Sequence, residues 1–256
     1  MRFSMITLGG LMLAAATPAM AQDDAAPADT PEITVTGSAS LTSDYRFRGI
    51  SQTGKDPALQ GTININDKSG FYAGFWASMI DGDDAPAVAG FGKAEVDLYA
   101  GFTKTLPGGV GIDVGLLYYL YPIDKAKGLA TDFFEPYASV SYTIGPVTAK
   151  VGANYAWSQK AIFDTDSLYL RGDVTVAIPG TPVSILGHVG HTDGALGVLA
   201  LTSDKYWDWS LGAEASYKFA KVGVQYVDTS IKGFGAGWDD AVGADPGILG
   251  YVTLSF

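Results

Sequence analysis

Hydrophobic and polar residues alternate with a period of two along most of this chain. In residues 147–158, the apolar set Val147, Ala149, Val151, Ala153, Tyr155 and Trp157 alternates with Thr, Lys, Gly, Asn, Ala and Ser. Residues 168–178 show the same pattern. Because successive side chains of an extended strand point to opposite faces, each segment predicts a β-strand with one apolar face and one polar face.

About twelve such segments follow one another along the sequence. They start near Ile33, Pro57, Gly70, Lys93, Val110, Asp132, Val147, Ser167, Pro182, Lys205, Lys221 and Asp245. Each is close to the ~9–11 residues that a tilted strand needs to cross a bilayer. An even number of such strands suits a closed antiparallel barrel.

The connections between these segments are short and long in turn. The short ones are residues 68–70, 106–109, 144–146, 179–182 and 219–221, and the long polar ones are 45–56, 81–92, 121–131, 159–166, 193–204 and 230–244. In outer-membrane barrels the short turns face the periplasm and the long loops face outside. Residues 33–256 therefore predict an all-β, up-and-down transmembrane barrel with both termini in the periplasm.

The two ends of the chain support export to the outer membrane of a Gram-negative bacterium. Arg2 precedes an apolar stretch that ends in the small-x-small sequence 19–21, which predicts a cleaved signal peptide over residues 1–21. Residues 22–32 are acidic, contain several Ala and Pro, and predict a flexible periplasmic lead-in. The final strand ends in Phe256 and resembles the strand by which such barrels are recognised for assembly. The expected partners are therefore the barrel assembly machinery, outer-membrane lipid and lipopolysaccharide.

A secreted β-sandwich or soluble barrel would also alternate, but two features count against it. A barrel of about twelve strands has an interior too wide to fill with side chains. Aromatic residues also gather at segment ends, as the interfacial girdles of a lipid-facing barrel do. These residues are Trp157, Tyr118, Tyr121, Trp207, Trp209, Tyr217 and Phe219.

Charge and cysteine content exclude several other classes of protein. The exported chain would carry 15 basic and 27 acidic residues, a formal charge of 15 − 27 = −12, which disfavours a nucleic-acid partner. Cysteine is absent, so disulfides, thiolate metal sites and cysteine nucleophiles are excluded. No uninterrupted apolar run after the leader reaches the ~18 residues of a spanning helix.

Charged residues on the polar faces of the strands are the candidates for lining a pore. They are Glu95, Asp97, Asp113, Glu135, Lys150, Arg171, Asp173, Glu214 and Lys218. A Lys or Arg facing hydrocarbon would cost ~2–4 kcal/mol at the bilayer midplane, so their phase indicates an aqueous or paired interior. Two interpretations stay open: an acidic channel that favours cations or neutral polar solutes, or internal ion pairs that occlude the barrel.

Acidic residues also gather in the predicted outer loops. They are Asp81, Asp83, Asp84, Asp164, Asp166, Asp239, Asp240 and Asp245. They form either a cation-attracting vestibule or a solvated loop surface, and the second is favoured. The sequence at 81–84 lacks the twelfth-position glutamate of a calcium loop, and no metal site or cofactor is predicted.

The sequence offers little material for an enzyme. The two histidines, His188 and His191, lie three apart on one predicted strand, so they face opposite sides and cannot jointly hold a metal. A lipid-acting barrel enzyme would need His188 on the outer surface beside a serine. His188 instead shares the inward phase of Ser184 and Gly190, so no catalytic activity is expected.

The most distinctive stretch is residues 41–61, followed by residues 69–81. It contains Tyr45 and the run Phe47 to Thr53, and then Gly70, Phe71, Tyr72, Gly74, Trp76 and Ser78. These runs resemble the motifs Tyr-x-Phe-Arg-Gly-Ile-Ser-Gln-Thr and Gly-Phe-Tyr-x-Gly-x-Trp-x-Ser of the TorF-like family of porin-like proteins. The resemblance is specific over about forty residues and implies an outer-membrane barrel of the porin type.

The first motif places Arg46 and Arg48 beside Asp44, where the first strand enters its loop, and Gly49 permits a sharp bend. Arg48 either folds inward as a cationic constriction that faces the carboxylates or pairs with Asp44 to hold the loop, and the second is favoured. The leading functional prediction is a porin for passive diffusion of small polar or cationic solutes. The alternatives are a closed structural or adhesive barrel whose loops bind a partner, and a barrel enzyme acting on lipid.

Overall fold

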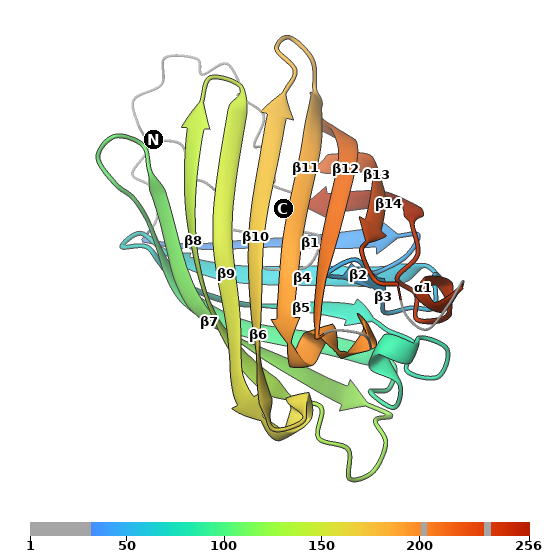
Figure 1. Ribbon diagram of the computed structural model, residues 1–256. Helices are drawn as coiled ribbons and strands as arrows, with labels where there is room; N and C mark the ends of the chain where they lie inside the picture. The colour runs from blue at the N-terminus through green and yellow to red at the C-terminus, as the bar shows by residue number, and fades with distance from the viewer. Residues whose placement is uncertain (1–31, 201–203, 233–236) are drawn as a thin grey trace.

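The computed structural model describes residues 32–200, 204–232 and 237–256, which form a closed antiparallel barrel of twelve strands (Figure 1). The barrel strands are β1 (Ile33–Thr42), β4 (Ala58–Asp67), β5 (Phe71–Met79), β6 (Ala94–Thr105), β7 (Gly111–Ile123), β8 (Phe133–Ile144), β9 (Val147–Gln159), β10 (Thr165–Ala177), β11 (Val183–Gly194), β12 (Lys205–Tyr217), β13 (Ala220–Thr229) and β14 (Gly247–Ser255). Their first residues lie within two positions of the predicted starts. The predicted fold is confirmed, whereas the predicted signal peptide and nearly all of the lead-in lie outside the described residues.

The barrel closes between its first and last strands. Residues 38–42 of β1 pair with residues 251–255 of β14. Two backbone hydrogen bonds of 3.0 Å between Gly37 and Phe256 continue this pairing. A Cβ atom at Gly37 would lie 2.5 Å from the Phe256 ring, so glycine leaves the space in which this ring packs.

The tight turns gather at one end of the barrel and most of the longer connections at the other (Figure 1). The longer connections contain the 3₁₀ turns η1 (Pro86–Val88), η2 (Lys160–Ile162) and η3 (Ala195–Ala200), and the short helix α1 (Trp238–Ala241). None of the described helices is long and apolar enough to cross a bilayer.

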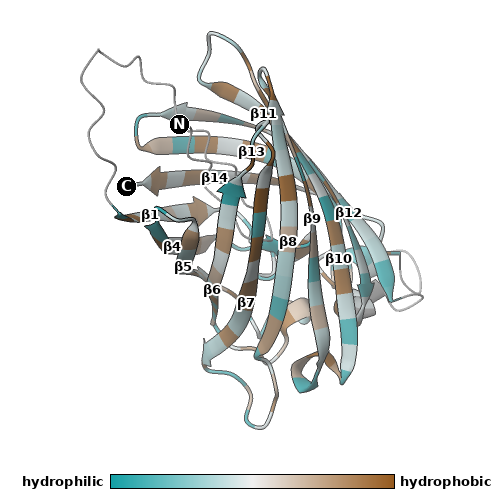
Figure 2. Ribbon diagram, turned by 90° about the vertical axis from the view of Figure 1, so that its left-hand side faces the viewer, coloured by the Kyte–Doolittle hydropathy of each residue, from teal (hydrophilic) through white to brown (hydrophobic). Residues whose placement is uncertain are grey.

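Hydrophobic and hydrophilic residues alternate along the barrel strands, which appears as alternating colour bands in Figure 2. The exposed large hydrophobic side chains belong to the outer set and most buried polar ones to the inner set. On β10, Leu168, Leu170 and Val174 are exposed outside, whereas Tyr169 is buried inside. Outward rings of β7, β8 and β9 form an aromatic band in which Phe134 stacks on Tyr118 at 4.4 Å and on Trp157 at 6.0 Å. This is the surface that a barrel presents to lipid.

Tyr121 is a correction to the predicted girdle, because its side chain is buried inside the barrel. Residues 118–121 carry aromatic side chains on both faces of β7, and Tyr121 shares the inward phase of Tyr119. Its ring packs edge-on against Phe91 of the β5–β6 connection at 4.6 Å.

Interior tyrosines lie across glycines on neighbouring strands. Tyr72 covers Gly101 and Tyr251 covers Gly223, and each pair is directly opposite in the sheet register. A Cβ atom at either glycine would overlap the phenol ring. The tyrosine therefore lies along the wall, and its hydroxyl donates to a carboxylate farther round the barrel, as Tyr72 does to Asp113 at 2.7 Å.

Substitution of Gly223 by valine is expected to displace the Tyr251 ring and break its 3.2 Å hydrogen bond to Glu214. Overpacking of this kind lowers the free energy of unfolding by ~1–3 kcal/mol, which urea titration of the purified barrel would measure. Gly250→Val is the matched control, because nothing lies within 4 Å of a Cβ atom at Gly250. Equal stability of the two variants would show that the Gly223 contact does not constrain Tyr251.

Candidate functional site

The connection between β1 and β4, residues 43–57, folds into the barrel and is called the plug below. It contains a two-stranded hairpin, β2 (Arg46–Phe47) and β3 (Ile50–Ser51). Tyr45, Arg46, Arg48, Ile50 and Ser51 are only 1–4 % exposed, although they belong to a connection between strands. This is the same stretch that carries the distinctive sequence motif.

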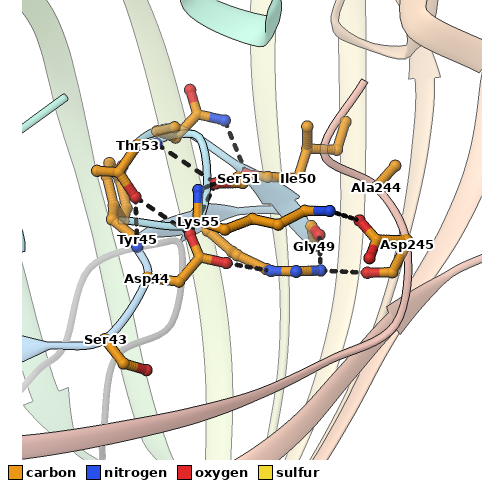
Figure 3. A network of polar contacts seen from close by, with 12 residues as sticks. Ser43, Asp44, Tyr45, Gly49, Ile50, Ser51, Thr53, Lys55, Ala244 and Asp245 are labelled. Atoms are coloured by element: carbon orange, nitrogen blue, oxygen red, sulfur yellow. Dashed lines mark hydrogen bonds and ion pairs between the residues drawn. The ribbon is translucent and has the colours of Figure 1, made fainter. Parts of the chain in front are cut away.

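The carboxylate of Asp44 organises the hairpin of the plug (Figure 3). It accepts hydrogen bonds from Arg46 Nε at 2.8 Å, Ser51 Oγ at 2.7 Å and Thr53 Oγ1 at 3.2 Å. The tip of the hairpin turns at Gly49, whose φ is +84°, a conformation that favours glycine. A Cβ atom there would also lie 2.5 Å from Thr229 Cγ2 on the wall.

The plug is also attached to the connection between β13 and β14 (Figure 3). Arg46 Nη1 donates to the carbonyl oxygen of Asp245 at 2.5 Å, and Lys55 Nζ lies 2.5 Å from Asp240 and 2.9 Å from Asp245. The backbone nitrogen of Ser51 donates to the Gly243 carbonyl at 2.8 Å. These bonds hold the plug to this connection, in addition to its contacts with the wall of the barrel.

Arg48 links the plug to the far wall of the barrel. Its Nη2 atom lies 2.6 Å from Glu135 Oε1 on β8, and both side chains are at most 2 % exposed. The guanidinium lies 4.7 Å from the centre of the Phe47 ring and 4.2 Å from that of Tyr169 on β10. Tyr206 on β12 donates to the Arg48 carbonyl at 3.1 Å.

The favoured interpretation of Arg48 is therefore wrong, and the alternative describes it. Arg46, not Arg48, pairs with Asp44, and Arg48 folds inward to face a carboxylate. The physical reason lies in the turn of the hairpin, which is formed by Arg48 and Gly49, both with positive φ. Arg48 therefore extends from the tip of the hairpin to the wall, whereas Arg46 stays on β2 beside Asp44.

Glu95 and Asp97 lie on the inner wall beside the plug. Tyr45 of the plug donates to Glu95 Oε1 at 3.3 Å, and its ring packs against Trp76 at 5.1 Å. Both carboxylates are buried, and Asp97 Oδ1 has no hydrogen-bond partner among the described residues. Three of the sequence-predicted lumen acids, including Glu135, therefore surround the plug.

Among the other predicted lumen charges, Asp173 and Lys150 keep more contact with solvent, whereas Asp113 and Glu214 are buried. The side chain of Asp173 is 33 % exposed and that of Lys150 is 19 % exposed, against 0 % for Glu135. They lie close to partners: Arg171 to Asp173 at 2.6 Å, and Lys150 to Asp113 at 4.0 Å. The interior thus holds fully enclosed charges at the plug and partly exposed charges, such as Lys150 and Asp173, on β9 and β10.

Lys218 does not lie in the lumen. Strand β12 ends at Tyr217, so Lys218 falls in the turn before β13, where its φ is 53° and its side chain is exposed. Lys221 takes the expected position, with its Nζ atom 3.1 Å from Glu214 Oε1. Glu214 itself lies on the inner face of the barrel, where its carboxylate is buried.

Asp208 and Tyr169 also lie inside the barrel, although the sequence did not single them out as lumen candidates. Asp208 is a partner of His188, and Tyr169 contacts the plug. His188 Nδ1 lies 2.6 Å from Asp173, and its Nε2 lies 3.0 Å from Asp208. Asp208 has the same parity on β12 as Glu214, so extending the alternation across the whole strand would have found it.

The two histidines face opposite sides of the sheet, as predicted. His191 packs against the exposed ring of Trp207 at 4.6 Å, whereas His188 lies inside. Both ring nitrogens of His188 face carboxylates or a tyrosine hydroxyl inside the barrel, so the requirement stated for a lipid-acting enzyme, His188 on the outer surface beside a serine, is not met. Within the described ranges, no cluster of His, Asp and Glu can hold a metal ion.

Acidic residues of the outer connections lie beside lysines. Lys93 Nζ is 2.7 Å from Asp81 and 2.6 Å from Asp83, and Lys125 Nζ is 3.0 Å from Asp132. The hydrogen bond from Lys93 lowers the pKa of Asp81 below its ordinary value. This carboxylate therefore stabilises the folded connection above the unfolded pKa of aspartate, about 3.9.

The Asp81 contribution is expected to be lost as the pH falls through its lowered pKa, and to be constant between pH 5 and 8. The backbone amide of Asp83, which donates to Asp81 Oδ1 at 3.0 Å, provides the measurement: its NMR shift should follow that titration. Asp81→Asn should give the acid-state shift already at pH 7. If the NMR shift of the Asp83 amide instead changes with a midpoint near pH 6, the pKa of Asp81 is not lowered and this prediction is contradicted.

Solved structures similar to this chain are outer-membrane barrels. A KdgM porin in complex with disordered oligogalacturonate matches with a TM-score of 0.56 and 8 % sequence identity, covering 87 % of this chain and 99 % of the other. An outer membrane channel from Pseudomonas putida F1 matches with a TM-score of 0.54 and 10 % identity, covering 91 % and 99 %. At such identities the likeness concerns the fold.

Sequence comparison identifies the family. No curated protein sequence matches the chain significantly. Residues 25–241 match the family described as "Bacterial protein of unknown function (Gcw_chp)", which is most of the chain, and the protein therefore belongs to this family.

Proposed function

We propose that this protein is a porin-type channel of the outer membrane that allows passive diffusion of small polar or cationic solutes. One observation carries the proposal: a closed barrel with an apolar outer surface contains a charged lumen whose side chains stay partly exposed to solvent beyond the plug. The names of the two similar structures, a porin and a channel, support it. Export through residues 1–21, assembly through the last strand and TorF-like identity remain predictions.

The balance of lumen charge favours cations. The acids described above are Glu95, Asp97, Asp113, Glu135, Asp173, Asp208 and Glu214, and the basic residues other than histidine are Arg48, Lys150, Arg171 and Lys221. The difference is 7 − 4 = 3 negative charges, with His188 between two of the acids. Side-chain charge of one sign along a pore attracts ions of the opposite sign.

The plug favours a second candidate, a closed barrel whose outer loops bind a partner. Plug residues contact inward side chains of β6, β8, β10 and β12, so they extend across the lumen. A permanently seated plug would leave no path for solute. The two candidates differ in one measurable property, ionic current.

The first experiment is a planar-bilayer recording of the purified protein in asymmetric salt. We expect discrete current steps with a reversal potential that indicates cation preference. A folded protein that shows no current, both as the wild type and with its plug removed, would contradict the channel and favour the closed barrel.

The double substitution Asp97→Asn/Asp113→Asn is expected to lower the cation preference, because it removes two negative charges from the lumen wall. The measurement is the shift of the reversal potential toward zero at unchanged salt gradient. Asp164→Asn is the control, since this residue lies in the connection between β9 and β10. An unchanged reversal potential in the double variant would exclude these two carboxylates from the ion path.

A further inference from the structure

Arg48 belongs to the plug, but its guanidinium group is bound by residues of the barrel wall. The carboxylate that it faces belongs to β8, and the Tyr169 ring against which it stacks belongs to β10. Arg48 itself arrives on the plug, from a connection between β1 and β4. The wall therefore provides the site, and Arg48, which belongs to a different segment of the chain, occupies it.

The wall groups of this site are held by other wall groups. The second oxygen of Glu135 accepts hydrogen bonds from Tyr119 Oη and Asn154 Nδ2, both at 3.0 Å. The hydroxyl of Tyr169 donates to Asp208 Oδ1 at 3.1 Å and lies 2.9 Å from His188 Nε2. None of these hydrogen bonds involves the plug, although the Tyr119 ring also packs edge-on against Phe47 of the plug at 5.8 Å. We therefore expect the wall groups to hold Glu135 and Tyr169 in place when Arg48 leaves.

The chemistry of the site suits a small organic cation. A carboxylate beside an aromatic face recognises guanidinium and alkylammonium groups by a charge-assisted hydrogen bond and a cation–π contact. With Arg48 absent, the Glu135 carboxylate and the Tyr169 ring would remain without a cation.

Arg48 fills the site incompletely. Only its Nη2 atom bonds Glu135, and its Nη1 atom is buried without a hydrogen-bond partner among the described residues. The Oε2 atom of Glu135 already accepts two hydrogen bonds, so Oε1 is the oxygen that can take a second donor. A free solute is not restrained by the plug backbone and can direct two N–H groups at Oε1, where Arg48 directs one, which gives it the means to compete with Arg48.

We propose that Glu135 and Tyr169 form a binding site for small guanidinium or alkylammonium solutes, which Arg48 occupies in the closed barrel. A solute that takes this place releases Arg48 and with it the wall contact of the plug. The inference rests on the proposed function and names its solute class. It assigns Arg48 the role of an internal stand-in for the solute.

The test uses the full-length Arg48→Ala protein in detergent, with methylguanidinium as the probe. We expect methylguanidinium at about five times its Kd to raise the midpoint of thermal unfolding by roughly 2–4 °C. The wild type should show a smaller shift at the same concentration, because Arg48 competes. N-methylurea, which is neutral and of similar shape, and sodium chloride at equal ionic strength are the controls.

The double variant Arg48→Ala/Glu135→Gln identifies the site. It should lose the methylguanidinium shift, since the carboxylate is gone while the cavity is retained. An equal shift in the single and double variants, or no shift in a folded single variant, would overturn the proposal. If Arg48→Ala folds poorly, the yield of folded barrel becomes the readout: methylguanidinium should raise it for the single variant only, and no rise would overturn the proposal.

The binding readout is independent of ionic current, so failure of this inference and failure of the channel are distinguishable. A protein that conducts but does not bind methylguanidinium overturns the solute class and leaves the channel intact. A protein that binds it in the single variant yet shows no current after plug removal supports the site and contradicts the channel.

Discussion

Replacement of residues 44–55 by a short glycine–serine turn is expected to increase the single-channel conductance several-fold. These residues carry the hairpin that crosses the lumen, and their largest side chains are almost fully buried against the wall. Removing them clears the part of the lumen that the plug crosses, while the twelve strands that form the wall are expected to keep their pairing. Conductance rises with the cross-section available to ions, so this variant should show the largest change of any described here.

Planar-bilayer recording in symmetric salt measures this effect, with the folded state of each variant checked beforehand by its migration on unheated gels. Deletion of residues 125–130 is the control, because that stretch of the β7–β8 connection is exposed and its hydrogen bonds go to Gly90, Thr131 and Asp132 rather than to the plug. The control should conduct as the wild type does. Equal conductance of the plug variant and the wild type would show that the plug is not the constriction.

The strand pattern was accessible from the sequence because its physical cause is local. A period of two in hydrophobicity follows directly from a strand that has lipid on one side and a polar lumen on the other. The turn residues between segments then place each strand to within two positions. Lys218 marks the limit of this pattern. It lies one residue beyond the end of β12, where even or odd position no longer determines whether a side chain faces the lumen.

The direction of the plug was not accessible in the same way. Its motif is polar, and a polar segment is compatible with solvent outside the barrel and with a charged lumen inside it. The choice depends on partners that are distant in sequence, such as Glu135 for Arg48 and the Asp245 carbonyl for Arg46. The sequence did show the chemical types involved, since both arginines and the lumen acids were candidates, but it did not show which pairs form.

Burial changes how much these ion pairs contribute to the stability of the folded protein. An ion pair in an exposed loop contributes little, because water and salt screen it. The Arg48–Glu135 pair is fully enclosed, so each charge depends on the other for the interactions that water no longer supplies. The same enclosed ion pair holds the plug against the wall, and it is the pair that a competing cation would have to break.

Glu135→Gln is accordingly expected to lower the free energy of unfolding by about 3–5 kcal/mol, because it leaves the Arg48 charge buried without its counter-ion. Reversible urea unfolding in lipid vesicles would measure this change. Lys93→Gln, which removes an exposed pair with Asp81, should change the stability little. The double variant Arg48→Met/Glu135→Gln should be more stable than Glu135→Gln alone, since it removes the stranded charge together with its partner. If the single and double variants are equally destabilised, the loss comes from the packing of Glu135 with Tyr119 and Asn154, and the ion pair is not what holds the plug against the wall.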